Sequence, residues 1–217
     1  MKRLQTAVLI SGRGSNLSTL IDACNSPNFP AEIICVISNR RNAPGLAYAE
    51  SAKIATVVIP HTAYSNRVEF DIAINKELMS RGVELICLAG FMRLFTAVFM
   101  KQWQDQILNI HPALLPSFTG LNAQQQALDA GVQISGCTVH FSRFDTDAGP
   151  IVAQAAVPIL PNDNVATLSE RILQAEHRIY PFALRLVAEG RACVVGNQVV
   201  IDEKYEPSHV LYNPPHR

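Results

Sequence analysis

The sequence lacks an excess of charge of either sign and lacks long apolar runs. Its 18 Lys and Arg residues balance 18 Asp and Glu residues, so the formal net charge is zero. Binding to nucleic acid needs a basic excess or a basic face, so we expect no nucleic-acid partner. No apolar run approaches the roughly 20 residues that cross a bilayer, and residues 1–10 lack the features of a signal peptide. We therefore expect no membrane segment and a cytoplasmic location.

Cysteines are few, and none of them forms a Cys-x-x-Cys pair. Their number is odd and their spacing is wide: Cys24, Cys35, Cys87, Cys137 and Cys193. Such a pattern suits buried free thiols in a reducing compartment better than a metal site or a redox pair. We expect no metal.

The length and composition indicate a globular chain. Of the 217 residues, 48% are apolar and 17% are charged, which excludes a disordered protein. The length favours one domain, perhaps with an appendage. We predict a single domain over residues 1–203 and a C-terminal tail over residues 204–217.

The first half of the chain alternates apolar runs with helical patterns. Runs that are apolar throughout suit strands buried on both faces of a parallel sheet. Helices are expected over 17–24, 45–52 and 67–79, the last with Val68, Ile72 and Leu78 on its buried face. The fold class is therefore α/β, a mostly parallel twisted sheet with helices on both faces. The predicted strands cover residues 6–10, 33–37, 56–59, 85–89 and 107–110.

The second half predicts an antiparallel element. Strands are expected over 136–141 and 151–157, with a short helix over 124–130 and a hairpin over 192–201 that turns at Gly196 and Asn197. A long helix is expected over residues 164–189, with a kink at Pro181. Its predicted buried positions are Leu168, Ile172, Ala175, Ile179, Leu184 and Val187.

A glycine-rich loop follows the first predicted strand. Its residues are Ser11-Gly12-Arg13-Gly14-Ser15-Asn16, and a helix is expected directly after them. Glycines expose backbone N–H groups and a helix N-terminus adds a positive dipole, so this loop suits a phosphate. It matches neither the dinucleotide fingerprint nor a Walker loop. One phosphate monoester is the expected ligand; the alternative is a tight turn with an ordinary Ser or Asn cap.

Asn109 and His111 lie at the end of the fifth predicted strand and project to the same side, because side chains two apart on a strand share a face. A carboxamide and an imidazole together can bind one carbonyl and move one proton. The alternative is a structural histidine. Asp147 lies in a loop of turn composition, and the alternative for it is a surface Asx turn. If Asp147 approaches His111, its charge favours the imidazolium and a general acid near neutral pH.

Three further positions have weaker signals. The segment Phe91-Met92-Arg93-Leu94-Phe95 follows the fourth predicted strand and suits the pocket of a flat heterocycle, or else an apolar loop that packs under the next helix. Arg67 suits a ligand carboxylate or a place on the surface. Glu176 suits an amine or a solvated helix face.

Taken together and in order, these segments resemble the phosphoribosylglycinamide formyltransferases, the folate-dependent enzymes of purine biosynthesis. The resemblance rests on residues 11–17, Leu88-Ala89-Gly90-Phe91-Met92-Arg93, residues 108–116 and Asp147-Ala148-Gly149-Pro150. It extends from about Thr6 to about Ile201. It implies a Rossmann-like formyltransferase fold and transfer of a formyl group from 10-formyltetrahydrofolate to the amine of 5'-phosphoribosylglycinamide.

The resemblance also implies a role for each matching residue. Asn109, His111 and Asp147 match the catalytic residues, with Asn109 as oxyanion donor and His111 as general acid. Gly14, Ser15 and Asn16 match the phosphate site, and Glu176 lies near the glycinamide. The positions implied for folate, largely through backbone, are Arg67, Met92, Arg93, Leu94, Phe95, Asn109, Arg143, Phe144, Asp145, Thr146 and Asp147.

Departures from the family pattern are Thr119, Asn122 and the bulky Phe95. The implied ligands are small molecules, and the implied state is a monomer or homodimer.

A formyltetrahydrofolate hydrolase usually carries an extra N-terminal domain, and a methionyl-tRNA formyltransferase usually carries an extra C-terminal domain and more positive charge. A non-catalytic nucleotide sensor would not need Asn109, His111 and Asp147 together. A dehydrogenase would need the glycine fingerprint.

Overall fold

The computed structural model describes residues 2–202 and residue 213. These residues cluster into two compact units. The first runs to Asn109 and includes Phe141–Phe144, and the second consists of Ile110–His140 and the residues from Asp145 onward. The tail predicted over 204–217 lies outside the described residues apart from Asn213, and the extent of a single domain stays a prediction.

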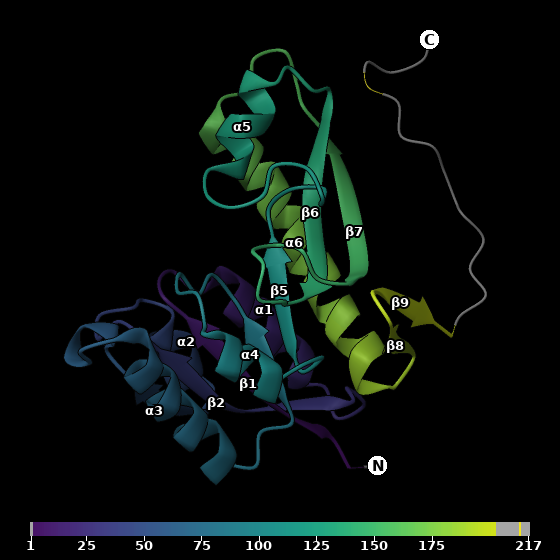
Figure 1. Cartoon of the computed structure of the whole chain (residues 1–217). Helices are drawn as coiled ribbons and strands as arrows, with labels where there is room; N and C mark the ends of the chain where they lie inside the picture. Colours follow the sequence, from purple (N-terminus) through teal and green to yellow (C-terminus); the bar gives the residue numbers. More distant parts are fainter. Residues whose placement is uncertain (1, 203–212, 214–217) are drawn as a thin grey trace. The chain divides into compact units, whose positions relative to one another are not determined.

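A parallel sheet forms the first unit (Figure 1). Its strands are β1 (Leu4–Ile10), β2 (Ala31–Ser38), β3 (Ala55–Val58), β4 (Leu85–Leu88) and the first part of β5 (Ile107–His111), residues 107–109. They lie in the order β3-β2-β1-β4-β5, and every neighbouring pair is parallel. The strand order reverses between β1 and β4, the kind of position where α/β sheets bind ligands. The five predicted strands are confirmed.

Helices cover both faces of this sheet. The helices of the first unit are α1 (Ser15–Cys24), α2 (Leu46–Ser51), α3 (Arg67–Ser80) and α4 (Ala97–Gln102), with the short 3₁₀ helix η1 (His61–Ala63). On one face, Leu9 packs in a cluster with Phe70 of α3 and Phe99 of α4. Val8 and Ile10 point to the opposite face and are fully buried, and α1 contacts β2. The predicted α/β class is confirmed.

The buried face predicted for α3 is partly wrong. Val68 and Ile72 are 54% and 61% exposed, whereas Phe70, Ile74 and Leu78 are buried. Residues at i, i+4 and i+8 share one side of a helix, and the side with Phe70 offers the larger apolar surface to the core. Helix α4 was not predicted either, because its apolar residues follow an irregular segment.

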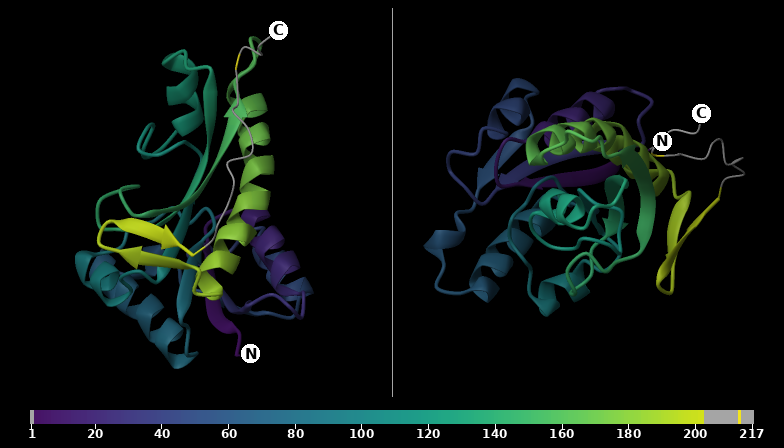
Figure 2. Two further views of the ribbon diagram at one scale, coloured as in Figure 1. Left: turned by 90° about the vertical axis from the view of Figure 1, so that its right-hand side faces the viewer. Right: turned by 90° about the horizontal axis from the view of Figure 1, so that it is seen from above.

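An antiparallel strand pair forms the second unit, as the sequence predicts. Strand β6 (Ile134–Phe141) pairs with β7 (Ile151–Pro158), and α5 (Ala123–Asp129) precedes them. Helix α6 (Val165–Ala188) contacts β7 and runs alongside it (Figure 2). The predicted hairpin consists of β8 (Ala192–Val195) and β9 (Gln198–Ile201).

Helix α6 begins with a capping box. The Asn164 side chain accepts from the Ala166 and Thr167 N–H groups, and the Thr167 hydroxyl accepts from the Asn164 N–H. The helix continues through Pro181. Four predicted core positions are confirmed, but Ala175 and Val187 are only half-buried. The buried residues are Leu168, Ile172, Glu176, Ile179, Tyr180, Ala183, Leu184 and Leu186.

Within residues 2–202, no helix combines the length and the apolar character that crossing a bilayer requires.

Asp163 gives the first testable prediction. Arg171 binds both its carboxylate oxygens, at 2.6 Å and 3.0 Å, and holds the pKa of the carboxyl well below its usual range. A lowered pKa in the folded state stabilises the protein above the unfolded value near 4 and stops doing so as the pH falls. We expect Asp163→Asn to lower the free energy of unfolding at pH 7 by about 1–2 kcal/mol and to flatten its decline between pH 5 and pH 2. Urea unfolding at several pH values measures this.

Asp129→Asn is the control. Asp129 is exposed, and its carboxylate accepts a hydrogen bond from the Gln125 side chain, four residues earlier in the sequence. Equal pH dependence in wild type and Asp163→Asn would contradict the prediction.

Candidate functional site

The glycine-rich loop connects β1 to α1 and turns at Gly14. Gly14 is the N-cap of α1, its φ is +76°, and its carbonyl accepts from the Ser18 N–H at 2.9 Å. No side chain caps this helix, so the alternative of an ordinary Ser or Asn cap does not hold. The first N–H groups of a helix have no acceptor inside the helix. The N-terminus of α1 lies at the position where the sequence predicts an anion site.

Gly14 and Gly45 let two loops touch. A Cβ on Gly14 would lie 2.6 Å from the Gly45 Cα, and a Cβ on Gly45 would lie 2.9 Å from the Gly14 Cα. The Gly45 N–H also donates to the Gly12 carbonyl at 3.0 Å. Gly45, the residue that precedes α2, therefore packs directly against the glycine-rich loop, and no local pattern in the sequence marks this contact.

The segment of residues 91–95 divides between core and surface. The rings of Phe91, Phe95 and Phe99 stack, with centroids 5.4 Å and 4.1 Å apart. Phe95 is only 6% exposed, so its side chain belongs to the core. Met92 and Leu94 are 60% and 57% exposed. The predicted contact with a flat ligand is therefore open to the side chains of Met92, Arg93 and Leu94, and to Phe95 only through its backbone.

Asp71 supports this segment and was missed by sequence reasoning. Its buried carboxylate accepts from the Thr96 N–H at 2.7 Å, at the start of α4. Burial raises the pKa of this carboxyl, while the Thr96 hydrogen bonds and the charges of Arg67 and Arg93 oppose the rise. Arg67 is the exposed first residue of α3. Only the contact with α4 distinguishes Asp71 from other helical aspartates.

The remaining predicted residues of the first unit are Asn109, Arg143 and Phe144. Asn109 is half-buried on β5, two residues before His111 on the same strand. The Arg143 guanidinium pairs with Asp105, so this side chain is engaged within the unit. Phe144 is 64% exposed.

His111 and Asp147 meet in the second unit, as the sequence analysis required. The His111 Nδ1 lies 3.3 Å from an Asp147 carboxylate oxygen, and both side chains are less than 10% exposed. The His111 Nε2 lies 2.8 Å from the Phe118 carbonyl oxygen. Each ring nitrogen of His111 therefore faces an oxygen atom. The alternative of Asp147 as a surface turn residue does not hold.

Two more residues contact the Asp147 carboxylate. The Gly120 N–H donates to it at 2.8 Å, and the His140 Nε2 lies 3.8 Å away. Asp147 itself has a φ of +55°, a backbone conformation that turn-forming Asp tolerates. His140 was missed, because no residue near it in the sequence marks it as a partner. The adjacent residues Asp145 and Thr146 are exposed.

Polar side chains of β6 and β7 hold the loop that follows His111. The Thr138 hydroxyl donates to the Ala113 carbonyl at 2.7 Å and accepts from the Leu115 N–H at 3.1 Å. The Gln154 amide donates to the Leu115 carbonyl at 3.0 Å. These bonds fix the direction in which the chain leaves the histidine.

Glu176 corrects one expectation. A solvated helix face was the simpler interpretation, but Glu176 is 7% exposed and lies on the buried side of α6. The neighbouring His177 has a pKa lowered by burial. A carboxylate that is buried this deeply has a structural or ligand-binding reason to be there.

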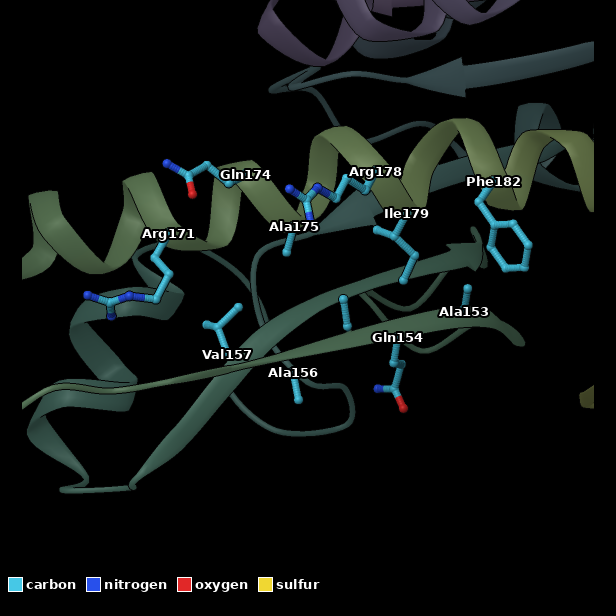
Figure 3. Close-up of a pocket in the computed structure, with 11 residues that line it drawn as sticks. Ala153, Gln154, Ala156, Val157, Arg171, Gln174, Ala175, Arg178, Ile179 and Phe182 are labelled. Carbon is cyan, nitrogen blue, oxygen red and sulfur yellow. The ribbon is translucent and has the colours of Figure 1, made fainter. Parts of the chain in front are cut away.

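The second unit also has a cavity of about 580 Å³ between β7 and α6 (Figure 3). Arg171, Arg178 and Phe182 line it from α6, and small residues such as Ala153 line it from β7. None of the predicted site residues lines this cavity, so it is separate from the chemistry described above.

Three buried cysteines are poor nucleophiles. Burial raises the pKa of Cys24 and Cys137 to about 12 and that of Cys35 to about 11, so these thiols stay protonated. Cys87 is buried too, whereas Cys193 is exposed. Among residues 2–202 and 213, no three His, Cys, Asp or Glu side chains are grouped as metal ligands would be.

Comparison with known proteins matches residues 4–184 to the formyl transferase family. The phosphoribosylglycinamide formyltransferase of Haemophilus influenzae is 45% identical over 207 residues, which are 95% of this chain and 97% of that protein. The human trifunctional purine biosynthetic protein adenosine-3 is 54% identical over 87% of this chain, but the match covers only 19% of that protein. The chain thus spans about a fifth of the length of this trifunctional relative.

A solved structure supports the same comparison. The glycinamide ribonucleotide transformylase 1 of Symbiobacterium toebii has a TM-score of 0.89 and 47% identity, covering 92% of this chain and 94% of that one.

The contact between Gly14 and Gly45 predicts a difference between two glycine substitutions. Gly45→Ala places a Cβ against backbone, so we expect a loss of about 1–3 kcal/mol in the free energy of unfolding. Gly12→Ala is the matched variant, because nothing lies within 4 Å of its added Cβ. We expect it to change stability by less than about 0.5 kcal/mol. Urea unfolding compares the two, and equal losses would show that the contact is absent.

Proposed function

Because the chain belongs to the formyl transferase family, we propose that it transfers the formyl group of 10-formyltetrahydrofolate to the amine of 5'-phosphoribosylglycinamide, a step of de novo purine (IMP) biosynthesis. The observation that carries the proposal is the buried pair of His111 and Asp147, 3.3 Å apart. This geometry supports His111 and Asp147, and the family resemblance adds Asn109 as the third catalytic residue.

Gly14, Ser15 and Asn16 bind the substrate phosphate in this proposal. The loop is supported by a left-handed glycine, a helix N-terminus and the close contact with Gly45. Backbone N–H groups and the helix dipole both favour a dianionic phosphate. In this proposal Glu176 lies near the glycinamide end of the substrate. Its buried carboxylate can pair with an ammonium or accept a hydrogen bond from an amide N–H.

Folate binding is assigned to residues 92–95 and 143–147, to Arg67 at the start of α3 and to Asn109 on β5. Exposed Met92, Arg93 and Leu94 give side-chain contacts, and Arg67 suits the carboxylate of the folate. The other assigned residues contribute chiefly backbone groups, and they are Phe95, Asn109, Arg143, Phe144, Asp145, Thr146 and Asp147.

The chemistry proceeds by direct attack. The glycinamide nitrogen forms a bond to the formyl carbon, and the carbonyl becomes a tetrahedral oxyanion to which Asn109 and His111 donate hydrogen bonds. The carbon–nitrogen bond to folate then breaks, with the electron pair going to the folate nitrogen. His111 delivers a proton towards that nitrogen, and the proton lost by the amine restores the balance through water. The Asp147 carboxylate orients the ring through Nδ1, and the Phe118 carbonyl must release Nε2 for this step.

The proposed ligands are two small molecules, without a nucleic acid or a metal, and the protein acts as a monomer or homodimer. Hydrolysis of the folate is the second candidate, because a hydrolase would use the same catalytic residues. Supplying 10-formyltetrahydrofolate with and without glycinamide ribonucleotide separates them. We expect formylated product and no appreciable deformylation in the absence of the acceptor. The reverse result would identify a hydrolase.

Substitution of the catalytic residues tests the mechanism. We expect His111→Ala and Asn109→Ala each to lower kcat by about 10²–10³, because each removes a donor to the oxyanion. The loss comes from the transition state, so we expect the KM values to change little by comparison. Steady-state kinetics of formyl transfer measures the effect, with Asp129→Asn as the control that retains wild-type rates. Near-normal kcat in both alanine variants would refute the assignment.

A further inference from the structure

A chain of hydrogen bonds crosses the carboxyl edge of the first unit's sheet. Ser11 and Asn39 directly follow β1 and β2, while His61 and Met92 lie in the connections after β3 and β4. The sheet order of these four strands is β3-β2-β1-β4. The hydrogen bonds join the four residues in the same order, so each bond connects neighbouring strand ends.

From Met92 through Ser11 to Asn39, the donors and acceptors of these hydrogen bonds have one consistent direction. The Met92 N–H donates to the Ser11 Oγ at 2.8 Å, and the Ser11 hydroxyl donates to the Asn39 Oδ1 at 2.6 Å. The Asn39 Nδ2 lies 3.1 Å from the His61 Nδ1. A backbone N–H can only donate and a hydroxyl has one hydrogen. With the Asn39 amide oxygen facing Ser11, its amide nitrogen donates to the His61 Nδ1 when that nitrogen carries no proton. A proton on Nδ1 would instead be donated to the Asn39 backbone carbonyl, 3.2 Å away.

The central members of the chain are buried. Ser11 is 4% exposed and Asn39 is 2% exposed. A buried polar group that loses its partner keeps its desolvation cost and gains nothing in return. Each residue therefore helps to hold its hydrogen-bond partners in place. Loss of the His61 acceptor would leave the Asn39 amide freer to move, and this would weaken its bond with Ser11.

Ser11 begins the glycine-rich loop, and Met92 begins the segment that exposes Met92, Arg93 and Leu94. The hydroxyl of Ser11 thus ties the proposed phosphate loop to the proposed folate segment through one backbone N–H. We propose that Asn39 and His61 are positioning residues that hold these two segments in one arrangement, so that the binding of both substrates depends on them. This inference rests on the function proposed above.

Kinetics distinguishes positioning from a merely structural role. In Asn39→Ala and in His61→Phe, we expect the KM for glycinamide ribonucleotide and the KM for the folate both to rise about tenfold, with kcat changed less than twofold. His61→Phe retains a ring against Phe70, whose centroid lies 6.4 Å from that of His61. This variant removes the acceptor with little loss of packing. His61→Gln restores an acceptor, and we expect it to recover most of both KM values.

Ser38→Ala is the matched control. The Ser38 side chain is fully buried and Ser38 is adjacent to Asn39 in the sequence. Its hydroxyl donates to the Arg40 carbonyl at 2.8 Å and takes no part in the hydrogen bonds that join His61, Asn39, Ser11 and Met92. We expect KM values in this variant within twofold of wild type, even if its unfolding midpoint falls.

Amide hydrogen exchange at Met92 tests the chain without any substrate. We expect this N–H to exchange at least tenfold faster in Asn39→Ala than in wild type or in Ser38→Ala. If Asn39→Ala fails to fold, the same comparison in His61→Phe replaces it.

The outcomes are separable. A wild-type protein that transfers no formyl group overturns the proposed function. The Met92 exchange rate still decides whether the hydrogen bonds from His61 to Met92 depend on one another. An active wild type whose Asn39 and His61 variants lose only stability, with both KM values unchanged, overturns the inference. A rise confined to one substrate overturns it too, because the two segments would then not be coupled.

Discussion

Parallel strands that are buried on both faces must all end at the same edge of their sheet, and the first unit is organised by this constraint. The loops after β1, β2, β3 and β4 have to share that edge without a ladder to pair their backbone groups. Hydrogen bonds join these loops instead. The side chains of Ser11, Asn39 and His61 bond to one another in order, and the Met92 N–H donates to Ser11. The loops that could bind ligands are therefore held by polar contacts, while the apolar cluster with α3 and α4 lies below them.

The second unit solves a different problem, which is to keep a histidine and a carboxylate together away from water. Burial alone would penalise the charged forms of both groups. Asp147 is compensated by the Gly120 N–H and by two histidines within 4 Å, and His111 by an acceptor at each ring nitrogen. Thr138 and Gln154 fix the chain next to the ring. Such preorganisation makes the pair suited to a transition state whose charge develops nearby.

The proposed function and the proposed positioning residues concern the same question, which is how the binding energy of the substrate phosphate contributes to the reaction. In the proposed substrate, the phosphate is separated from the reacting amine by the ribose. The binding energy of the phosphate would aid the reaction only if the glycine-rich loop kept a fixed relation to the segment of residues 92–94. The hydrogen bond from Met92 to Ser11 gives that relation a physical basis within the first unit. Asp71 adds to it by holding the start of α4, immediately after the segment that exposes Met92, Arg93 and Leu94.

Local patterns along the sequence predicted the strands, the α/β class, the antiparallel second half and the residues of the glycine-rich turn. It could do so because apolar runs, helix periodicity and turn chemistry are local properties. It also singled out His111 and Asp147 as partners, although only the tertiary structure brought them to 3.3 Å. Asp71, His140, Gly45 and Asn39 had no local signal, since each acts on a residue far away in the chain. The buried face of α3 and the burial of Glu176 were decided in the same way. Which side of a helix is covered depends on what packs against it, and that is a property of the folded chain alone.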